Sequence, residues 1–211
     1  EISGLEIVND VSFLNEDYSL RTKMNRTGVA VVAQNAGTID HIVLDDLYIH
    51  DVKGNVYDKH MNNGGIYFTV FMPEDEASTG IPKYNDVTIQ NCYVKDVSRW
   101  GIALAYTAYY NQFNAAEIDD TVCQKYGATD VVIKNNYIES VGGDAITTMY
   151  CYQPLVEYNV ADGVAKEINA DIYSATAFGR VAAGIWPWKC KDAVFQYNEV
   201  FDTCYNGDAQ A

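Results

Sequence analysis

The sequence lacks the features that mark several classes of protein. Only 4 of its 211 residues are proline, and no apolar run approaches the roughly 20 residues that a membrane-spanning helix needs. No signal-peptide pattern occurs. Basic residues are scarce, since 14 lysines and arginines face 29 aspartates and glutamates, for a net charge of −15. Nucleic acids and anionic membranes are bound through basic patches, so the charge disfavours both and also disfavours polyuronate substrates.

Motifs for metal binding and nucleophilic catalysis are also missing. The five cysteines form no C-x-x-C pair and have no metal-binding spacing with the three histidines. An odd cysteine count does not fit a complete disulfide framework, so the disulfide state stays open. No G-x-S-x-G elbow or phosphate-binding loop is present. The acidic runs at residues 74–76 (EDE) and 119–120 (DD) offer the oxygen ligands that Ca²⁺ prefers, although such runs are more often solvated surface. Ca²⁺ is therefore the one cofactor candidate, and nothing in the sequence requires it.

What the sequence does contain is a repeat. Four segments share one pattern: residues 42–52 (IVLDDLYIHDV), 87–97 (VTIQNCYVKDV), 131–141 (VVIKNNYIESV) and 193–203 (AVFQYNEVFDT). In each, apolar and polar residues alternate, the eighth residue is apolar and the tenth is Asp or Ser. Weaker copies occur at residues 5–13 and 155–162. Recurrence over some tens of residues, with a period of two inside each copy, predicts stacked strands. We expect an all-β fold, a right-handed parallel β-helix (solenoid) of about six coils with loop insertions.

Each repeat has a second half in which a small residue precedes an apolar strand. The instances are residues 28–32 (GVAVV), 65–70 (GIYFTV), 101–106 (GIALAY), 145–148 (AITT), 184–188 (GIWPW) and 209–211 (AQA). A glycine or alanine suits a corner at which the chain turns sharply between two packed strands. Residues 1–211 are therefore predicted to form a single β-helix domain. Because both ends lie inside recognisable coils without polar caps, we expect a longer β-helix or a second chain to continue it.

The insertions between coils are expected to build the walls of one groove, most clearly at residues 73–84, 107–126 and 163–180. The sequence is rich in aromatic residues, with 17 tyrosines and 3 tryptophans. Amphipathic rings suit the apolar faces of sugars, and packing between loops is the alternative role. The candidates are Tyr67, Tyr106, Tyr109, Tyr110, Tyr150, Tyr152, Trp186 and Trp188.

Alignment of the coils gives one column just before the small corner residue: Thr27, Gly64, Trp100, Asp144, Ala183 and Asp208. Two coils read Gly-Asp-Ala there, which places a carboxylate at the mouth of a rigid strand. Ordinary turn chemistry explains the same triplet. If Asp144 and Asp208 lie two coils apart, their separation is roughly 9.5 Å. That is at the upper edge of the spacing in inverting glycosidases and too long for a retaining pair, but side chains can tilt by roughly an ångström or two, so neither mechanism is excluded.

The segment at residues 184–211, GIWPWKCKDAVFQYNEVFDTCYNGDAQA, resembles part of the secreted right-handed β-helix proteins of gut bacteria, in particular the lacto-N-biosidases of glycoside hydrolase family 136. The resemblance implies release of lacto-N-biose from milk-type oligosaccharides with retention, by two aspartates on the β-helix. It places the acid/base on Asp208, in NGDAQA, and the nucleophile past Ala211. The rest of the β-helix, or a second chain, is then expected to complete the site.

We therefore expect an extracellular or cell-surface bacterial glycosidase in which Asp208 is the catalytic acid/base. Trp186 and Trp188 are predicted to contact sugar rings, and Asp144 and Gln210 to hydrogen-bond hydroxyls; no residue is assigned to a metal. Two alternatives stay open. A polysaccharide lyase of the same fold would use Ca²⁺ and a base such as Arg99, Arg180 or Lys189, unless these residues form salt bridges. A non-catalytic carbohydrate-binding or adhesin-like β-helix would keep the aromatic residues. The exact glycan, the second carboxylate and the oligomeric state stay open.

Overall fold

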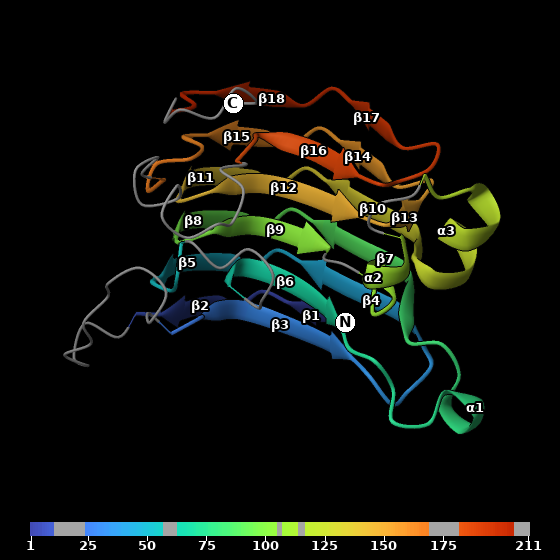
Figure 1. Cartoon of the computed structure of the whole chain (residues 1–211). Coiled ribbons are helices and arrows are strands. Elements are labelled where there is room, and N and C mark those ends of the chain that lie inside the picture. Colours follow the sequence, from blue (N-terminus) through green and yellow to red (C-terminus); the bar gives the residue numbers. More distant parts are fainter. Residues whose placement is uncertain (11–23, 57–62, 105–106, 114–116, 169–181, 205–211) are drawn as a thin grey trace.

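The computed structural model describes residues 1–10, 24–56, 63–104, 107–113, 117–168 and 182–204. Its strands lie in three parallel sheets (Figure 1). Sheet A contains β1 (Ile2–Ser3), β4 (Thr38–Asp45), β7 (Lys83–Gln90), β10 (Ala128–Lys134), β14 (Leu155–Glu157) and β17 (Val194–Gln196), with β13 (Cys151–Tyr152) paired to β10. Sheet B contains β2 (Glu6–Asn9), β5 (Tyr48–Val52), β8 (Tyr93–Val97), β11 (Tyr137–Val141), β15 (Val160–Asp162) and β18 (Glu199–Phe201). Sheet C contains β3 (Thr27–Ala33), β6 (Gly64–Val70), β9 (Trp100–Leu104), β12 (Asp144–Met149) and β16 (Ile185–Trp188).

The chain passes through sheets A, B and C in turn, and then returns to sheet A beside the strand it left there. We call one such passage a rung. Figure 1 shows the rungs stacked on one another, from β1–β3 to β17–β18. Neighbouring strands pair in parallel, as in β4 with β7 and β7 with β10. The predicted all-β, parallel organisation is confirmed.

Three short helices lie within the predicted insertions, to one side of the stack (Figure 1). They are α1 (Glu76–Thr79), α2 (Tyr110–Phe113) and α3 (Asp120–Tyr126). None of the helices among the described residues has the length and apolar character needed to cross a membrane.

The strand registers match the alignment of the sequence repeats. Ile42 pairs with Val87, and Val87 pairs with Val131, so the first residues of three repeats lie in one column of sheet A. In sheet B, Val94 pairs with Ile49 on one side and with Ile138 on the other. The eighth place of the repeat is therefore a continuous apolar column that faces the interior.

The tenth place of the repeat is explained by backbone conformation. Asp51, Asp96, Ser140 and Asp202 all have φ between 50° and 53°. This left-handed region is unfavourable for most residues, and aspartate and asparagine tolerate it better than others. A second left-handed column, which includes Asp46, Asn91 and Asn135, lies between sheets A and B. The polar residues that interrupt each repeat thus mark the places at which the rung bends.

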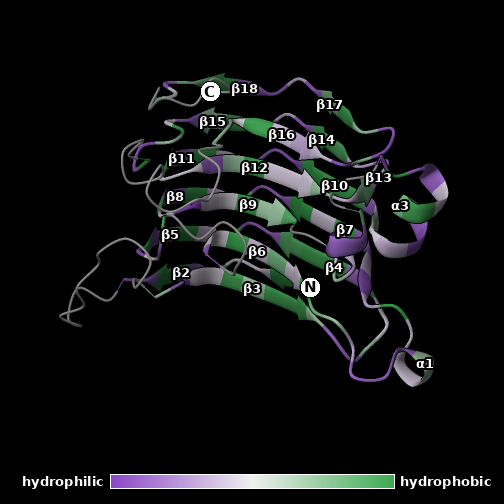
Figure 2. Ribbon diagram, viewed as in Figure 1, coloured by the Kyte–Doolittle hydropathy of each residue, from purple (hydrophilic) through white to green (hydrophobic). Residues whose placement is uncertain are grey.

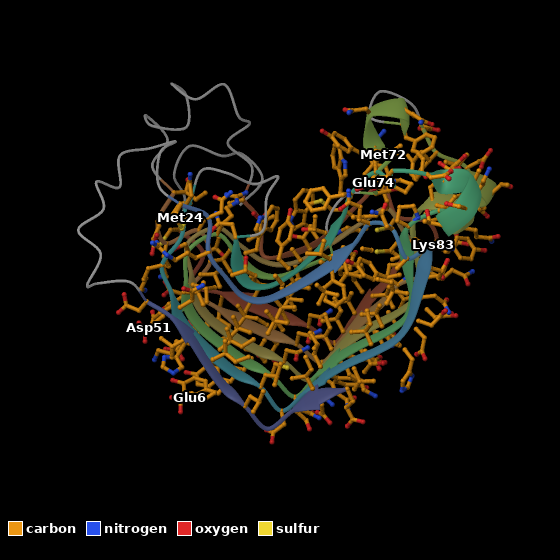
Figure 3. The ribbon with its side chains drawn as sticks, turned by 90° about the horizontal axis from the view of Figure 1, so that it is seen from below. Glu6, Met24, Asp51, Met72, Glu74 and Lys83 are labelled. Atoms are coloured by element: carbon orange, nitrogen blue, oxygen red, sulfur yellow. The ribbon has the colours of Figure 1, made fainter. Side chains whose placement is uncertain are left out.

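Side chains fill the space that the three sheets enclose, as the view along the stack shows (Figure 3). The apolar residues of the strands run along the stack in all three sheets (Figure 2). At the corner leading into sheet C, the small residues make room for sheet B. A Cβ added to Gly65 would lie 2.5 Å from Cγ1 of Val94, and one added to Gly101 would lie 2.8 Å from Cγ2 of Ile138. The same relation joins Gly28 to Ile49 and Gly184 to Val200.

In each case the glycine belongs to one rung and the branched residue to the next. The rung whose corner residue is Ala145 is followed by Ala161 at the eighth place, in register with Ile138. Glycine therefore occurs opposite a β-branched neighbour and alanine opposite alanine, which keeps the packed volume nearly constant.

Three asparagines, of which Asn136 and Asn159 are buried and Asn198 is partly buried, connect the later rungs at the corner between sheets A and B. Asn136 Nδ2 donates to Asn159 Oδ1 at 2.9 Å, and Asn159 Nδ2 donates to Asn198 Oδ1 at 3.0 Å. Each of the three amides also donates to a sheet A carbonyl of the preceding rung. Cys92 occupies the equivalent place one rung earlier, and its backbone N–H donates to Asn136 Oδ1 at 2.9 Å. The ladder satisfies backbone groups that the bend would otherwise leave buried and unpaired.

Replacing Gly101 with alanine is expected to lower the free energy of unfolding by about 1–3 kcal/mol, because the new methyl group overlaps Ile138 and the carbonyl oxygen of Ala145. The loss should be smaller when Ile138 is also alanine, since that background reproduces the Ala145–Ala161 arrangement. Urea titrations of the four chains measure both quantities. An equal cost in the two backgrounds would show that the corner is not limited by this contact.

Replacing Asn159 with alanine is expected to cost about 2–4 kcal/mol, because it leaves donors and acceptors of two neighbouring rungs buried without partners. The matched control is Asn85→Ala on the exterior, where the amide donates to Asp40 Oδ1. That substitution should change the urea midpoint very little. Comparable losses for the two variants would argue against a special role for the ladder.

Candidate active site

The predicted corner column lies along the first positions of sheet C. Thr27 pairs with Gly64, Gly64 with Trp100, and Trp100 with Asp144. This part of the column is confirmed. The other predicted members of the site, Asp208 and Gln210, lie outside the described residues, as does Tyr106.

Asp144 forms a buried ion pair with Arg99 from the preceding rung. Arg99 Nη2 lies 2.7 Å from Asp144 Oδ2, and both side chains are 0% exposed. The guanidinium carbon of Arg99 also lies 4.8 Å from the ring centroid of Trp100, which is a cation–π distance. The predicted salt-bridge role of Arg99 is confirmed. Its particular partner was not predicted.

Two glycines make this packing possible. A Cβ on Gly142 would lie 1.7 Å from the carbonyl oxygen of Ser98. One on Gly143 would lie 2.5 Å from the carbonyl oxygen of Arg99 and 2.8 Å from its Cδ. Because Gly142 and Gly143 have no side chains, the backbone before Asp144 can pack closely against Ser98 and Arg99 of the preceding rung.

The other oxygen of Asp144 faces the following rung. Asp144 Oδ1 accepts hydrogen bonds from the indole Nε1 of Trp186 at 2.8 Å and from the backbone N–H of Ala183 at 2.9 Å. Arg99, Asp144 and Trp186 thus form one network across three successive rungs. The carboxylate is buried and both of its oxygens are engaged, so in this structure it does not present a free oxygen at the surface.

Trp186 and Trp188 lie two positions apart in β16 and therefore on the same face of the strand. Their ring centroids are 6.2 Å apart with an interplanar angle of 70°, an edge-to-face arrangement. Trp186 is partly exposed, and Trp188 is 40% exposed. The end of the strand is fixed by Tyr150, whose N–H donates to the Trp188 carbonyl, and by Lys189, whose Nζ donates to the Phe113 carbonyl in α2. Two rings with accessible surface are therefore held at the edge of sheet C.

The predicted tyrosines have mostly a packing role. Tyr67 and Tyr150 are buried in a second apolar cluster on the outer side of sheet C, with Trp100 and Met149, and Tyr110 and Tyr152 pack against it. Tyr109 is also buried, and its hydroxyl donates to Glu76 Oε2 at 2.5 Å. Burial is the main cause of the raised pKa of Tyr150. Among the aromatic candidates that the structure describes, Trp188 is the most exposed, and Trp186 is partly buried, as Tyr110 and Tyr152 are.

The acidic runs considered for Ca²⁺ serve as helix caps. Asp75 accepts from backbone N–H groups at the start of α1, and Asp119 accepts from Val122 N at the start of α3. Among the described residues, no group of three or more His, Cys, Asp or Glu side chains is arranged to hold a metal ion.

Replacing Asp144 with asparagine is expected to lower the free energy of unfolding by about 3 kcal/mol, because the charge of Arg99 stays buried without its counterion. The control is Asp202→Asn, which neutralises the exposed carboxylate paired with Lys166 at 2.6 Å. No measurable change is expected there. Urea titration of both variants checks the contrast, and equal stabilities would contradict the burial of an essential charge pair.

Comparisons with known proteins agree with the fold. No protein-family model matches the chain. A curated lacto-N-biosidase from Bifidobacterium longum subsp. longum is 50% identical over 208 residues, which cover 90% of this chain and 13% of that protein. The crystal structure of a GH136 lacto-N-biosidase from Eubacterium ramulus, as its selenomethionine derivative, superposes with a TM-score of 0.91 at 52% identity, over 97% of this chain and 33% of that one. The native crystal form gives a TM-score of 0.88 at 52% identity, over 93% and 32%.

The chain thus spans about an eighth of the curated relative (13%) and a third of the crystallised chain (33%). The resemblance predicted from residues 184–211 extends over nearly the whole sequence. In sequence and in fold, this chain matches a segment of the lacto-N-biosidases of glycoside hydrolase family 136.

Proposed function

We propose that this chain is part of a bacterial, extracellular or cell-surface glycoside hydrolase that releases lacto-N-biose from milk-type oligosaccharides with retention. The observation that carries the proposal is the match to the Eubacterium ramulus GH136 lacto-N-biosidase, at 52% identity and a TM-score of 0.91. A net charge of −15 is compatible with an uncharged glycan and unfavourable for an anionic one.

The scaffold in this proposal is a right-handed parallel β-helix of about six coils. It is supported by the strand order, in which each rung adds one strand to each of the three sheets. The site lies on the outer side of sheet C, at its later rungs. Further rungs of a longer polypeptide would continue the stack beyond β18 (Glu199–Phe201) and complete the site.

Asp208 is the proposed general acid/base. It would protonate the glycosidic oxygen of the leaving group and later activate the attacking water. The proposal rests on the corner column, which contains Asp144 and continues in sequence to Asp208. A second carboxylate past Ala211 would act as the nucleophile, because retention needs two carboxyl groups only about 5 Å apart.

Sugar rings are proposed to contact Trp186 and Trp188, with Gln210 donating to a hydroxyl. The partly exposed indoles support this role. A second observation comes from the same face of the sheet. Trp100 Nε1 and Thr147 Oγ1 are buried and form no hydrogen bond within the described part of the chain. Buried polar atoms of this kind are usually satisfied by water or by a polar ligand.

The lyase alternative receives less support. Of its candidate bases, Arg99 is held in the buried pair with Asp144, and Lys189 donates to the Phe113 carbonyl. Arg180 lies outside the described residues. A non-catalytic carbohydrate-binding role remains an outcome that the assay can distinguish.

The natural polypeptide that carries this chain is expected to hydrolyse aryl β-lacto-N-bioside and lacto-N-tetraose. Asp208→Asn should lower kcat by roughly 10²–10⁴-fold, since it removes the proton donor. Chromatography of the released disaccharide and release of the aryl group measure the reaction.

Asp202→Asn, which neutralises an exposed carboxylate earlier in the sequence, is the matched control and should retain wild-type rates. Unchanged hydrolysis by Asp208→Asn would exclude the acid/base role. Unsaturated products that absorb ultraviolet light and disappear with chelator would indicate a lyase. Binding of the glycan without any turnover would indicate a non-catalytic domain.

A further inference from the structure

We infer that Asp144 and Arg99 are a positioning pair, which sets the orientation of the Trp186 indole instead of contacting the sugar. The inference rests on the proposed function in one respect, since it takes Trp186 as a ring against which the sugar packs. It replaces the predicted role of Asp144 as a direct ligand of substrate hydroxyls.

Both oxygens of the Asp144 carboxylate already have partners. Asp144 Oδ2 lies 2.7 Å from Arg99 Nη2, and Oδ1 accepts from Trp186 Nε1 and from Ala183 N at 2.8 and 2.9 Å. The side chain is 0% exposed. A sugar hydroxyl that reached this carboxylate would displace one of three short interactions inside a closed region. The observed hydrogen bond instead joins the buried carboxylate of Asp144 to the partly exposed indole of Trp186.

The indole of Trp186 is anchored through its N–H. A Trp side chain has two rotatable bonds, and only its N–H can anchor it directionally. A charge-assisted hydrogen bond from that N–H to a carboxylate fixes the rotation of the ring. Trp186 is in register with Thr147 of the rung below, and Trp188 meets it edge to face. The ring is thereby restrained at its polar edge and along one side, while the residue stays partly exposed.

The cation of the pair is an arginine, and its guanidinium makes two different contacts. The guanidinium of Arg99 pairs with Asp144 and also stacks 4.8 Å from the Trp100 centroid, which in turn lies 6.3 Å from the ring of Tyr67. A planar guanidinium serves both contacts, whereas a lysine ammonium does not. Burial of such a pair rarely increases stability over an apolar replacement, and geometric specificity is the better reason for its presence. Here the specificity concerns the orientation of the two indoles, Trp100 and Trp186.

The test is a double-mutant cycle in the natural polypeptide that carries this chain. Asp144→Asn is made in the wild-type and in the Trp186→Phe backgrounds, and KM and kcat are measured on aryl β-lacto-N-bioside. Asp144→Asn should raise KM about tenfold in the wild type, with kcat within threefold, because ring placement affects binding. In the Trp186→Phe background the same change should raise KM less than twofold. An equal increase in both backgrounds would mean that Asp144 contacts the sugar directly, and would overturn the inference.

Tryptophan fluorescence provides a readout that does not depend on turnover. Asp144→Asn should shift the emission maximum, and the shift should be smaller in the Trp186→Phe background, where Trp100, against which Arg99 stacks, can still respond. Unchanged emission in the wild-type background would overturn the inference even if KM rises. If the wild-type protein neither cleaves nor binds the glycan, the proposed function fails, and the emission shift still decides whether Asp144 positions Trp186.

Two further variants control for stability. Arg99→Met combined with Asp144→Asn leaves no buried unpaired charge, and it keeps an amide oxygen able to accept from Trp186 Nε1. It should restore stability but keep the shifted emission and the raised KM, because a neutral amide replaces the charged pair that orients the indole. Recovery of both values to the wild-type level in the folded protein would show that the pair acts on stability alone, and would overturn the inference. Asp202→Asn should leave the emission and KM at wild-type values, since its partner is Lys166 and not an indole.

Discussion

The structure depends on the backbone being able to bend at the same places in every rung. The bends use left-handed residues, and the columns that contain Asp46 and Asp51 recur from rung to rung. Each such residue is unfavourable by about 1 kcal/mol or more for an ordinary side chain. Aspartate and asparagine lower that cost, and the stacked strands supply the hydrogen bonds that fix the bends. Without bends in register, the strands of successive rungs would not meet, and neither the interior nor the sheet C face would form.

Stacking in register also explains why polar side chains connect the rungs in two places. In the interior, the amides of Asn136, Asn159 and Asn198 hydrogen-bond one above the other and satisfy carbonyls at the bend. On the sheet C side, Arg99 and Asp144 continue the same axial direction to Trp186. The first network fixes the path of the backbone. The second network links the stacked rungs to the partly exposed indole of Trp186. The rigid scaffold therefore determines where the candidate binding residues lie.

Much of the fold could be predicted from the sequence, because one repeat determines one rung and parallel pairing copies it. The eighth-place apolar column and the small corner residues lie where the repeat indicates. The candidate site was harder to predict because its contacts join different rungs. Arg99 and Asp144 are 45 residues apart in the sequence. The repeat predicts that their strands are neighbours, but it does not predict that these two side chains pair. The one local signal was the Gly142–Gly143 step, whose missing side chains leave room for Arg99. Likewise, Asp75 and Asp119 begin short helices, a role that acidic composition alone does not distinguish from Ca²⁺ binding.

Each small corner residue is fitted to a side chain of the following rung, and this limits how segments of such chains can be exchanged. Gly101 is matched to Ile138 of the following rung, and Ala145 is followed by Ala161. A rung cut at its natural ends, from one sheet A strand to the next, would separate each small residue from the side chain to which it is fitted. The unit that can be duplicated, deleted or grafted without a steric conflict is therefore staggered. It begins at a sheet C strand and ends after the sheet B strand of the next turn, and we expect the boundaries of viable chimeras to follow that offset.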